Sequence, residues 1–158
     1  MSAVCLYLGK ECSVAEEIVI FDIDGTLADV SERIHHVKKK PKNWNAFFQG
    51  MAQDKAIHSM VRLCNVLYES GIKILLCSGR NEEHRPQTVQ WLAQQGIHYH
   101  KLILRRDGDM RSDTVAKREM LAGIDRSKIL FVVEDRSRVV ERWRSEGLVC
   151  LQCAPGEF

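Results

Sequence analysis

Residues 18–26 read IVIFDIDGT, and this stretch decides the fold. The apolar run over residues 18–23 predicts a buried strand. Alternate side chains of a strand point the same way, so Asp22 and Asp24 would lie on one side of its carboxyl end, and Gly25 allows the chain to turn there. A single pair of acids after a strand is more often a turn or a helix cap than a site. Its meaning therefore depends on the residues at the ends of the other strands.

Four more short apolar runs are predicted to be buried strands: residues 72–77, 101–104, 129–133 and 148–152. The stretches between them carry apolar residues at helical spacing. Strands that alternate with helices are typical of parallel β-α units. We therefore predict an α/β fold, a three-layer Rossmann-like sandwich with a central parallel sheet of about five strands.

Two segments do not fit this alternation. Residues 1–17 precede the first strand and carry no readable motif, so we describe them as an N-terminal extension of unknown role. Residues 28–56 are too long for a turn and too polar for a core helix. We expect them to form a small, partly helical cap insert within one domain, residues 18–158. The insert would stand at the carboxyl edge of the sheet, where ligands bind in open α/β sheets.

Polar residues that suit phosphate chemistry come after the other strands. A hydroxyl and a glycine after the second strand could meet a phosphate. Two acids end the fourth strand, and a lysine lies in a predicted helix that begins near residue 112 or 113. Together with the first pair of acids, these residues are Asp22, Asp24, Ser78, Gly79, Arg80, Lys117, Glu134, Asp135 and Arg136.

These positions resemble the haloacid dehalogenase (HAD) superfamily of phosphotransferases. DIDGT at 22–26 resembles its first motif, Ser78 its second, Lys117 its third, and Glu134 with Asp135 its acidic fourth. SGR at 78–80, RRDGDMRSDTVAKREML at 105–121 and VEDRSRVVERWRSEGLVCLQCAPGEF at 133–158 are similar to the phosphatase domain of polynucleotide kinase–phosphatase enzymes. That domain typically has two aspartates where this chain has Glu134 and Asp135, which keeps a carboxylate at both places.

The resemblance implies a Mg²⁺-dependent phosphomonoesterase that forms an aspartyl-phosphate. Asp22 would be the nucleophile and Asp24 the general acid and base. Ser78 and Lys117 would bind the transferring phosphoryl group. Mg²⁺ would be held by Asp22, the backbone carbonyl of Asp24 and Asp135, and Glu134 could add a contact through a water. Substrate contacts are expected from Thr26, Gly79, Arg80, Arg111 and Arg136.

Two substrates stay open for such an enzyme. The similarity of the second half to the kinase–phosphatase enzymes favours a 3′-phosphate on a DNA or RNA end and a role in nucleic-acid end repair. Residues 101–118 contain six basic residues and three aspartates, which suits a nucleic-acid end or a nucleotide's phosphate. The net charge of only +2 and the small insert suit free nucleoside or deoxynucleoside monophosphates. The kinase motif G-x-x-x-x-G-K-[ST] is absent, so the resemblance implies the phosphatase alone, either free-standing or with a kinase or ligase partner in trans. A remote alternative is a non-catalytic HAD-fold binding domain.

The insert carries aromatic and basic residues with two readings each. Trp44, Phe47 and Phe48 could stack on a base, but their spacing favours anchoring the insert to the body. The run of lysines at 38–40 with Lys42 favours a solvated surface over a patch that tracks a nucleic-acid backbone.

Composition limits the class of protein. The chain has 158 residues, of which 45% are hydrophobic and 28% charged, as in one globular domain. No apolar run approaches the ~20 residues of a membrane span, and residues 1–17 lack a secretory signal pattern, so we expect no membrane partner. Among six cysteines only Cys150 and Cys153 form a close pair, without the second pair that zinc requires. Reduced, mostly buried thiols in the cytoplasm are expected.

Overall fold

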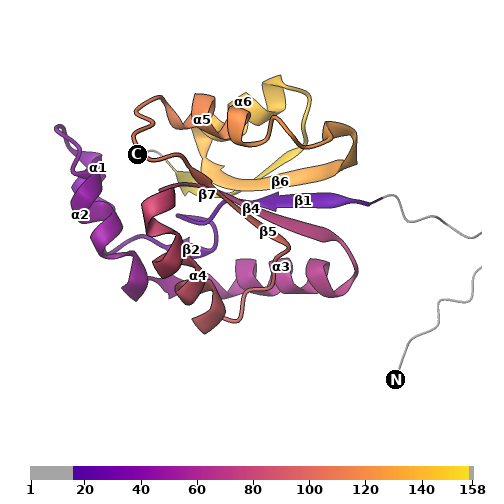
Figure 1. Ribbon diagram of the computed structural model, residues 1–158, viewed down its shortest axis with the longest axis horizontal. Helices are drawn as coiled ribbons and strands as arrows, with labels where there is room; N and C mark the ends of the chain where they lie inside the picture. Colours follow the sequence, from indigo (N-terminus) through magenta and orange to yellow (C-terminus); the bar gives the residue numbers. More distant parts are fainter. Residues whose placement is uncertain (1–15, 157–158) are drawn as a thin grey trace, which may run out of the picture.

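The computed structural model describes residues 16–156 and contains a five-stranded sheet of order β5-β4-β1-β6-β7 (Figure 1). All neighbouring strands in this sheet are parallel. The α/β fold with a central parallel sheet of five strands is thus confirmed. In chain order the strands are β1 (Ile18–Phe21), β4 (Lys73–Asn81), β5 (Lys101–Arg105), β6 (Ile129–Arg136) and β7 (Cys150–Gly156).

Helices cover both faces of the sheet (Figure 1). α3 (His58–Glu69) and α4 (Arg85–Gln94) lie on one face, and α5 (Asp113–Met120) and α6 (Ser137–Ser145) lie on the other. A hydrophobic core lies on each face of the sheet, and neighbouring β1 residues point into different cores. Phe21 packs in the cluster that contains Trp91 of α4, and Ile20 packs in the cluster that contains Trp143 of α6. β1 is apolar throughout because both its faces are covered. Two short 3-10 helices, η2 (Glu82–His84) and η3 (Arg126–Lys128), complete the body.

The strand ends differ from the sequence prediction. β4 continues beyond residue 77 to Asn81, and β6 continues beyond residue 133 to Arg136. In both strands the pairing register shifts within the added residues. These residues are polar because they lie at the end of the sheet beyond the core, so the apolar pattern stops before the strand does. β1 ends at Phe21, earlier than predicted, because the chain turns directly after it.

Residues 28–56 form a small unit at the carboxyl end of the sheet (Figure 1). β2 (Ala28–Asp29) pairs antiparallel with β3 (Lys55–Ala56). Between them lie α1 (His35–Lys38), α2 (Trp44–Gln49) and the 3-10 helix η1 (Met51–Gln53). Val30, Val37 and Phe47 form a core of their own in this unit, which we call the insert.

The cysteines in the described part of the chain are free thiols, and three of them are buried. Burial raises the pKa of Cys64 and of Cys150 to about 12. Cys150 and Cys153 belong to clusters on opposite faces of the sheet, so they do not form a metal-binding pair. Cys5, Cys12 and most of the predicted extension 1–17 lie outside the described residues. Within residues 16–156, the helices are all too short or too polar to span a bilayer.

Candidate active site

The turn after β1 brings two acids to the centre of the sheet edge. The Asp22 N–H donates to the Val133 carbonyl of β6 at 3.0 Å, which aligns the two strands as they end. Gly25 has a φ of +89°, and a Cβ at this position would collide with the Asp135 carboxylate. A Cβ at Gly156 would collide with the same residue from β7. Two glycines therefore leave the space that the Asp135 side chain fills.

Three buried carboxylates lie together, and two of them contact one lysine. Oxygens of Asp22, Glu134 and Asp135 all lie within 4.8 Å of one another. The Lys117 Nζ lies 2.6 Å from Asp22 Oδ1 and 2.6 Å from Glu134 Oε2. Lys117 reaches them from α5, across 95 residues of sequence from Asp22. One ammonium group cannot balance three carboxylates at this distance.

The pKa values of all three carboxyl groups are raised, because the cluster is buried and holds more negative than positive charge. Burial, together with the negative charge of Glu134, raises the pKa of Asp22 well above its ordinary value. Burial raises the pKa of Glu134 to about 7, and burial with the charge of Asp22 raises that of Asp135 to about 7. Burial alone would lower the pKa of Lys117, but Asp22 and Glu134 outweigh it and raise that pKa. A further positive charge would stabilise the ionised acids.

The cluster fits a divalent metal ion. Asp135 Oδ1 is buried and lacks a hydrogen-bond partner among residues 16–156. A buried carboxylate oxygen without a partner is costly, and a cation would satisfy it. The donors available are carboxylate oxygens, which hard cations such as Mg²⁺ and Ca²⁺ prefer. Asp22, Glu134 and Asp135 could therefore bind a metal.

Asp24 faces two buried arginines. Its Oδ1 accepts hydrogen bonds from Arg80 Nη2 at 2.7 Å and from Arg33 Nη2 at 2.5 Å. Burial favours the neutral acid, but the charges of Arg80 and Arg33 outweigh it and hold the pKa of Asp24 well below its ordinary value. The arginines thus favour the ionised form, which can accept a proton from water. They oppose the protonated form, which a proton donor to a leaving group must adopt.

Arg33 connects Asp24 to the insert, and the sequence analysis missed it. Its guanidinium also binds Asp54, with Nε at 2.8 Å from Oδ1 and Nη2 at 2.5 Å from Oδ2. It donates to the Phe47 carbonyl at 3.1 Å and lies 4.1 Å from the centre of the Phe47 ring. In the sequence Arg33 is one base in a polar stretch. Its pairing with Asp54, 21 positions later, leaves no local signal.

Asp113 was also missed as a site residue. It accepts hydrogen bonds from Arg105 at 2.8 Å and from Arg136 at 3.1 Å, and its Oδ2 lies 3.6 Å from Lys117 Nζ. A Cβ at Gly79 would lie only 2.7 Å from Asp113 Oδ1, so the glycine allows this close packing. The spacing of four residues between Asp113 and Lys117 was the available signal.

A cavity of about 340 Å³ gives access to these groups. It is bordered by the insert and by the segments around α5 and the start of α6. The residues predicted for the site that line it are Asp22, Asp24, Gly79, Arg111, Lys117 and Arg136. The Arg111 guanidinium is bound by Asp109 at 2.8 Å and by Glu119 at 2.6 Å.

The other predicted site residues lie behind the cavity wall. Glu134 and Asp135 belong to the cluster of acids around Lys117. Ser78 is fully buried, and its hydroxyl accepts the Arg80 N–H at 3.3 Å. Arg80 is fully buried against Asp24, so its contact is with the acid. Thr26 is fully buried, and its hydroxyl accepts from the Cys153 thiol at 3.6 Å.

The aromatic residues of the insert were predicted either to anchor it to the body or to stack on a base. Phe47 is 2% exposed, in the core of the insert, and the Phe48 ring lies 5.0 Å from the His84 ring of the body. Phe48 thus packs against the body, as the spacing favours, whereas Phe47 belongs to the insert's own core; both rings also line the cavity. Trp44 is 37% exposed and lines the cavity.

The chain matches the model of the family described as "Polynucleotide kinase PNKP phosphatase domain" over residues 16–158. A chain in a solved Pnkp1/Rnl/Hen1 complex is 28% identical with a TM-score of 0.78, and the match covers 98% of this chain and 51% of that one. The class C acid phosphatase from Bacillus anthracis shares the fold, at 16% identity and a TM-score of 0.63 over 92% of this chain and 70% of that chain. Acid phosphatase 1 from Solanum lycopersicum is 42% identical over 55 residues, 34% of this chain and 22% of that protein. The match thus spans about half of the Pnkp1-complex chain and less than a quarter of the tomato enzyme.

Proposed function

Because this chain belongs to the family of polynucleotide kinase PNKP phosphatase domains, within the HAD superfamily, we propose that it is a Mg²⁺-dependent phosphatase that removes 3′-phosphates from polynucleotide ends. The observation that carries the proposal is the convergence of three residues. Asp22 and Lys117 line one cavity and contact each other, and Asp135 lies beside Asp22 behind the cavity wall. The proposed mechanism needs a nucleophile, a cation for the phosphoryl oxygens and a metal-binding acid within reach of one anion.

In the first step an Asp22 carboxylate oxygen attacks phosphorus. The bond between phosphorus and the sugar oxygen breaks, and the phosphoryl group becomes attached to Asp22. Lys117, at 2.6 Å from Asp22, binds the phosphoryl oxygens and offsets their charge. The departing sugar oxygen needs a proton, which Asp24 would deliver.

In the second step water cleaves the aspartyl-phosphate. Asp24 takes the proton of the water, which attacks phosphorus and releases inorganic phosphate, so Asp22 is regenerated. Arg33 and Arg80 favour the ionised Asp24 that this step requires. We therefore expect the second step to depend on Asp24 more than the first.

Asp22, Asp135 and the Asp24 carbonyl would hold Mg²⁺, with Glu134 contacting it through a water. The bound metal would supply positive charge that offsets the acids and the phosphate dianion. Ser78 would support the phosphoryl site from behind Gly79.

The Asp24→Asn variant tests whether the second step depends on Asp24 more than the first step does. We expect one phosphate equivalent to be transferred to Asp22 and turnover then to slow by about a hundredfold or more, because the amide cannot accept the proton of water. Mass spectrometry of the acid-quenched protein would detect the covalent phosphate. If no phosphorylated protein accumulates, the first step depends on Asp24 at least as strongly as the second.

Metal removal tests the acidic cluster. We expect chelation to lower phosphate release by about a hundredfold or more, since the acids would repel the substrate without a compensating charge. Added Mg²⁺ should restore the rate. Full activity in chelator would contradict the metal assignment.

Substrate comparison tests the reaction. Phosphate release is measured from a 3′-phosphorylated oligonucleotide, the same oligonucleotide with a 5′-phosphate, and free nucleoside monophosphates. We expect the 3′-phosphorylated strand to have the highest kcat/KM. Preference for free nucleotides would instead indicate a nucleotide phosphatase.

A solved relative forms the Pnkp1/Rnl/Hen1 complex, which supports the proposal of a kinase or ligase partner in trans.

A further inference from the structure

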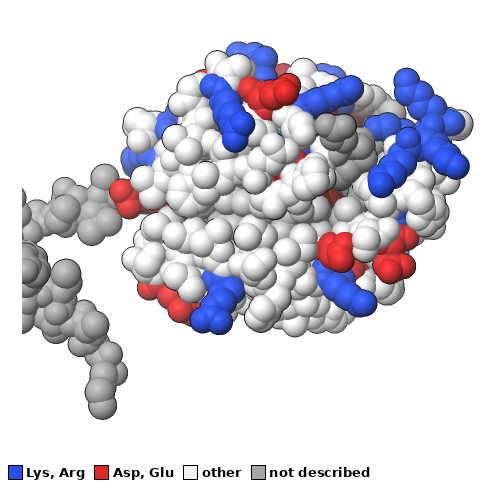
Figure 2. All heavy atoms as spheres, turned by 180° about the vertical axis from the view of Figure 1, so that it is seen from behind, with Lys and Arg blue, Asp and Glu red and all other residues white. Residues whose placement is uncertain are grey.

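The mouth of the cavity carries side chains that the reaction scheme does not use. Lys42 and Trp44 come from the insert, and Arg138 comes from the first turn of α6. All three line the cavity that contains Asp22. Figure 2 shows Lys and Arg side chains gathered at the end of the molecule that the insert forms.

The other arginines that line this cavity are bound by acids. Arg105 and Arg136 contact Asp113, and Arg111 contacts Asp109 and Glu119. Such pairs leave little positive charge for a second anion.

Lys42 and Arg138 differ from these arginines. Within residues 16–156 neither of them forms an ion pair. Partial burial lowers the pKa of Lys42, and the positive charges of Arg136 and Arg138 lower it further. Cations from two sides of the cavity thus repel each other, and an anion between them would remove this repulsion.

Trp44 keeps Lys42 at the mouth. The Lys42 Nζ lies 5.3 Å from the centre of the Trp44 ring, a cation–π contact. The ring itself packs on Phe47 and Phe48, with centres 5.7 and 6.1 Å away. The lysine is therefore held beside the cavity although it is exposed.

We propose that Lys42 and Arg138 bind a second phosphate of the substrate, the one on the 5′ side of the nucleotide whose 3′-phosphate is removed. This inference rests on the proposed function and deepens it. In a nucleic-acid strand the second phosphate is the phosphodiester that joins the terminal nucleotide to the rest of the chain. A nucleoside 3′-monophosphate lacks it. Lys42 and Arg138 would thus distinguish a strand end from a free nucleotide.

Two small substrates isolate this contact. A nucleoside 3′-monophosphate carries only the reacting phosphate, and the nucleoside 3′,5′-bisphosphate adds the second one. We expect kcat/KM for release of the 3′-phosphate to be about tenfold higher with the bisphosphate, the gain of one charge-assisted contact. In the double variant Lys42→Gln/Arg138→Gln this ratio should fall to about one.

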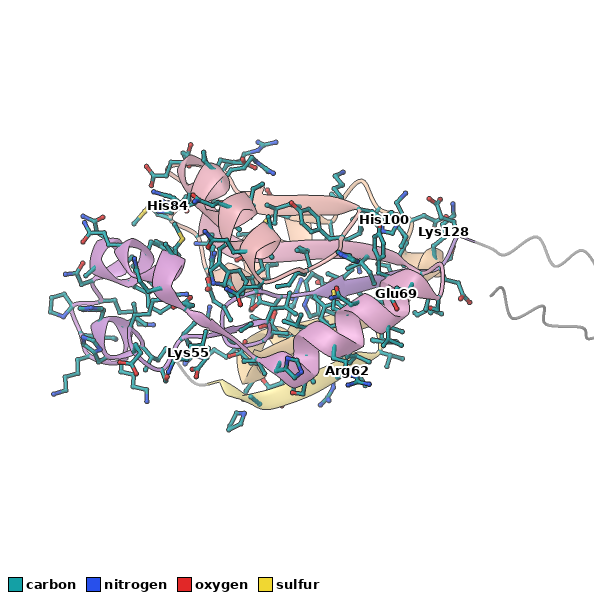
Figure 3. All side chains as sticks on the ribbon, turned by 90° about the horizontal axis from the view of Figure 1, so that it is seen from below. Lys55, Arg62, Glu69, His84, His100 and Lys128 are labelled. Atoms are coloured by element: carbon teal, nitrogen blue, oxygen red, sulfur yellow. The ribbon has the colours of Figure 1, made fainter. Side chains whose placement is uncertain are left out.

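Arg62→Gln is the matched control. Arg62 is exposed on α3 and does not line the cavity (Figure 3). Its variant should keep the ratio of the wild-type protein. With a 3′-phosphorylated oligonucleotide, the slope of log(kcat/KM) against log salt concentration should flatten by about 0.7 for each of Lys42 and Arg138 replaced.

The outcomes separate the two proposals. A wild-type ratio near one, or a ratio that persists in the double variant, would overturn the second-phosphate site and leave the phosphatase intact. If no 3′-phosphorylated compound is hydrolysed while other phosphomonoesters are, the proposed function fails, and this inference fails with it. Thermal unfolding of each variant checks that the fold is retained, as expected for exposed residues.

Discussion

Asp22→Asn is expected to abolish phosphate release, with kcat lower by about 10⁴-fold or more, because the amide cannot form the covalent intermediate. The fold should persist. In the absence of metal the variant should unfold at a higher temperature than the wild type, since it removes one of three crowded acids whose pKa values are raised by burial and mutual repulsion.

Phosphate release and thermal unfolding measure the two effects on one sample. Asp125→Asn is a matched control, since Asp125 caps η3 through the Ser127 N–H at 3.0 Å, outside the cavity. It should retain activity. Retained turnover in Asp22→Asn would remove Asp22 from the role of nucleophile.

Arg33→Ala is expected to have the largest effect on stability. The Arg33 and Asp54 side chains are only 4% and 2% exposed, and removal of the arginine leaves Asp54 and Asp24 buried with one cation fewer. Breaking a buried pair in this way costs about 3–5 kcal/mol of unfolding free energy. Activity should fall as well, because Asp24 loses one of the two groups that position it.

Denaturant unfolding and kcat on the 3′-phosphorylated oligonucleotide measure these effects. Arg33→Lys separates charge from geometry: it should restore part of the stability but less of the activity, since lysine cannot bind Asp24, Asp54 and the Phe47 carbonyl together. Arg62→Ala, on the surface of α3, should change neither. A stable, fully active Arg33→Ala protein would show that the connection between the insert and Asp24 is dispensable.

The fold was predictable because its signals are local. A short apolar run overlaps each strand of the sheet, although the run at 148–152 meets β7 only from residue 150 onward. The order of strands and helices along the chain restricts the topology to parallel units. The convergence of Asp22, Lys117 and Asp135 was expected from a general property of parallel sheets, whose strand ends meet at one edge. The motif resemblance added their expected roles.

The polar network behind the cavity was not predictable in this way. Arg33 forms ion pairs with Asp54 and Asp24, and Asp113 forms ion pairs with Arg105 and Arg136. Tertiary packing determines all of these contacts. Arg80 illustrates the same limit. Its place after the second strand was recognised, but its direction toward Asp24 depends on the backbone of residues 78–81, where the strand register shifts.

Gly25 and Gly156 carry no reactive group, yet they enclose the Asp135 carboxylate from two sides. In a complete mutational scan, both positions should be as intolerant as the acids themselves, since even alanine adds an atom where Asp135 already lies. The positions at which substitution abolishes activity would therefore include two glycines that contribute only their small volume. Enzyme redesign at this edge of the sheet must therefore keep both glycines as strictly as it keeps the charged groups.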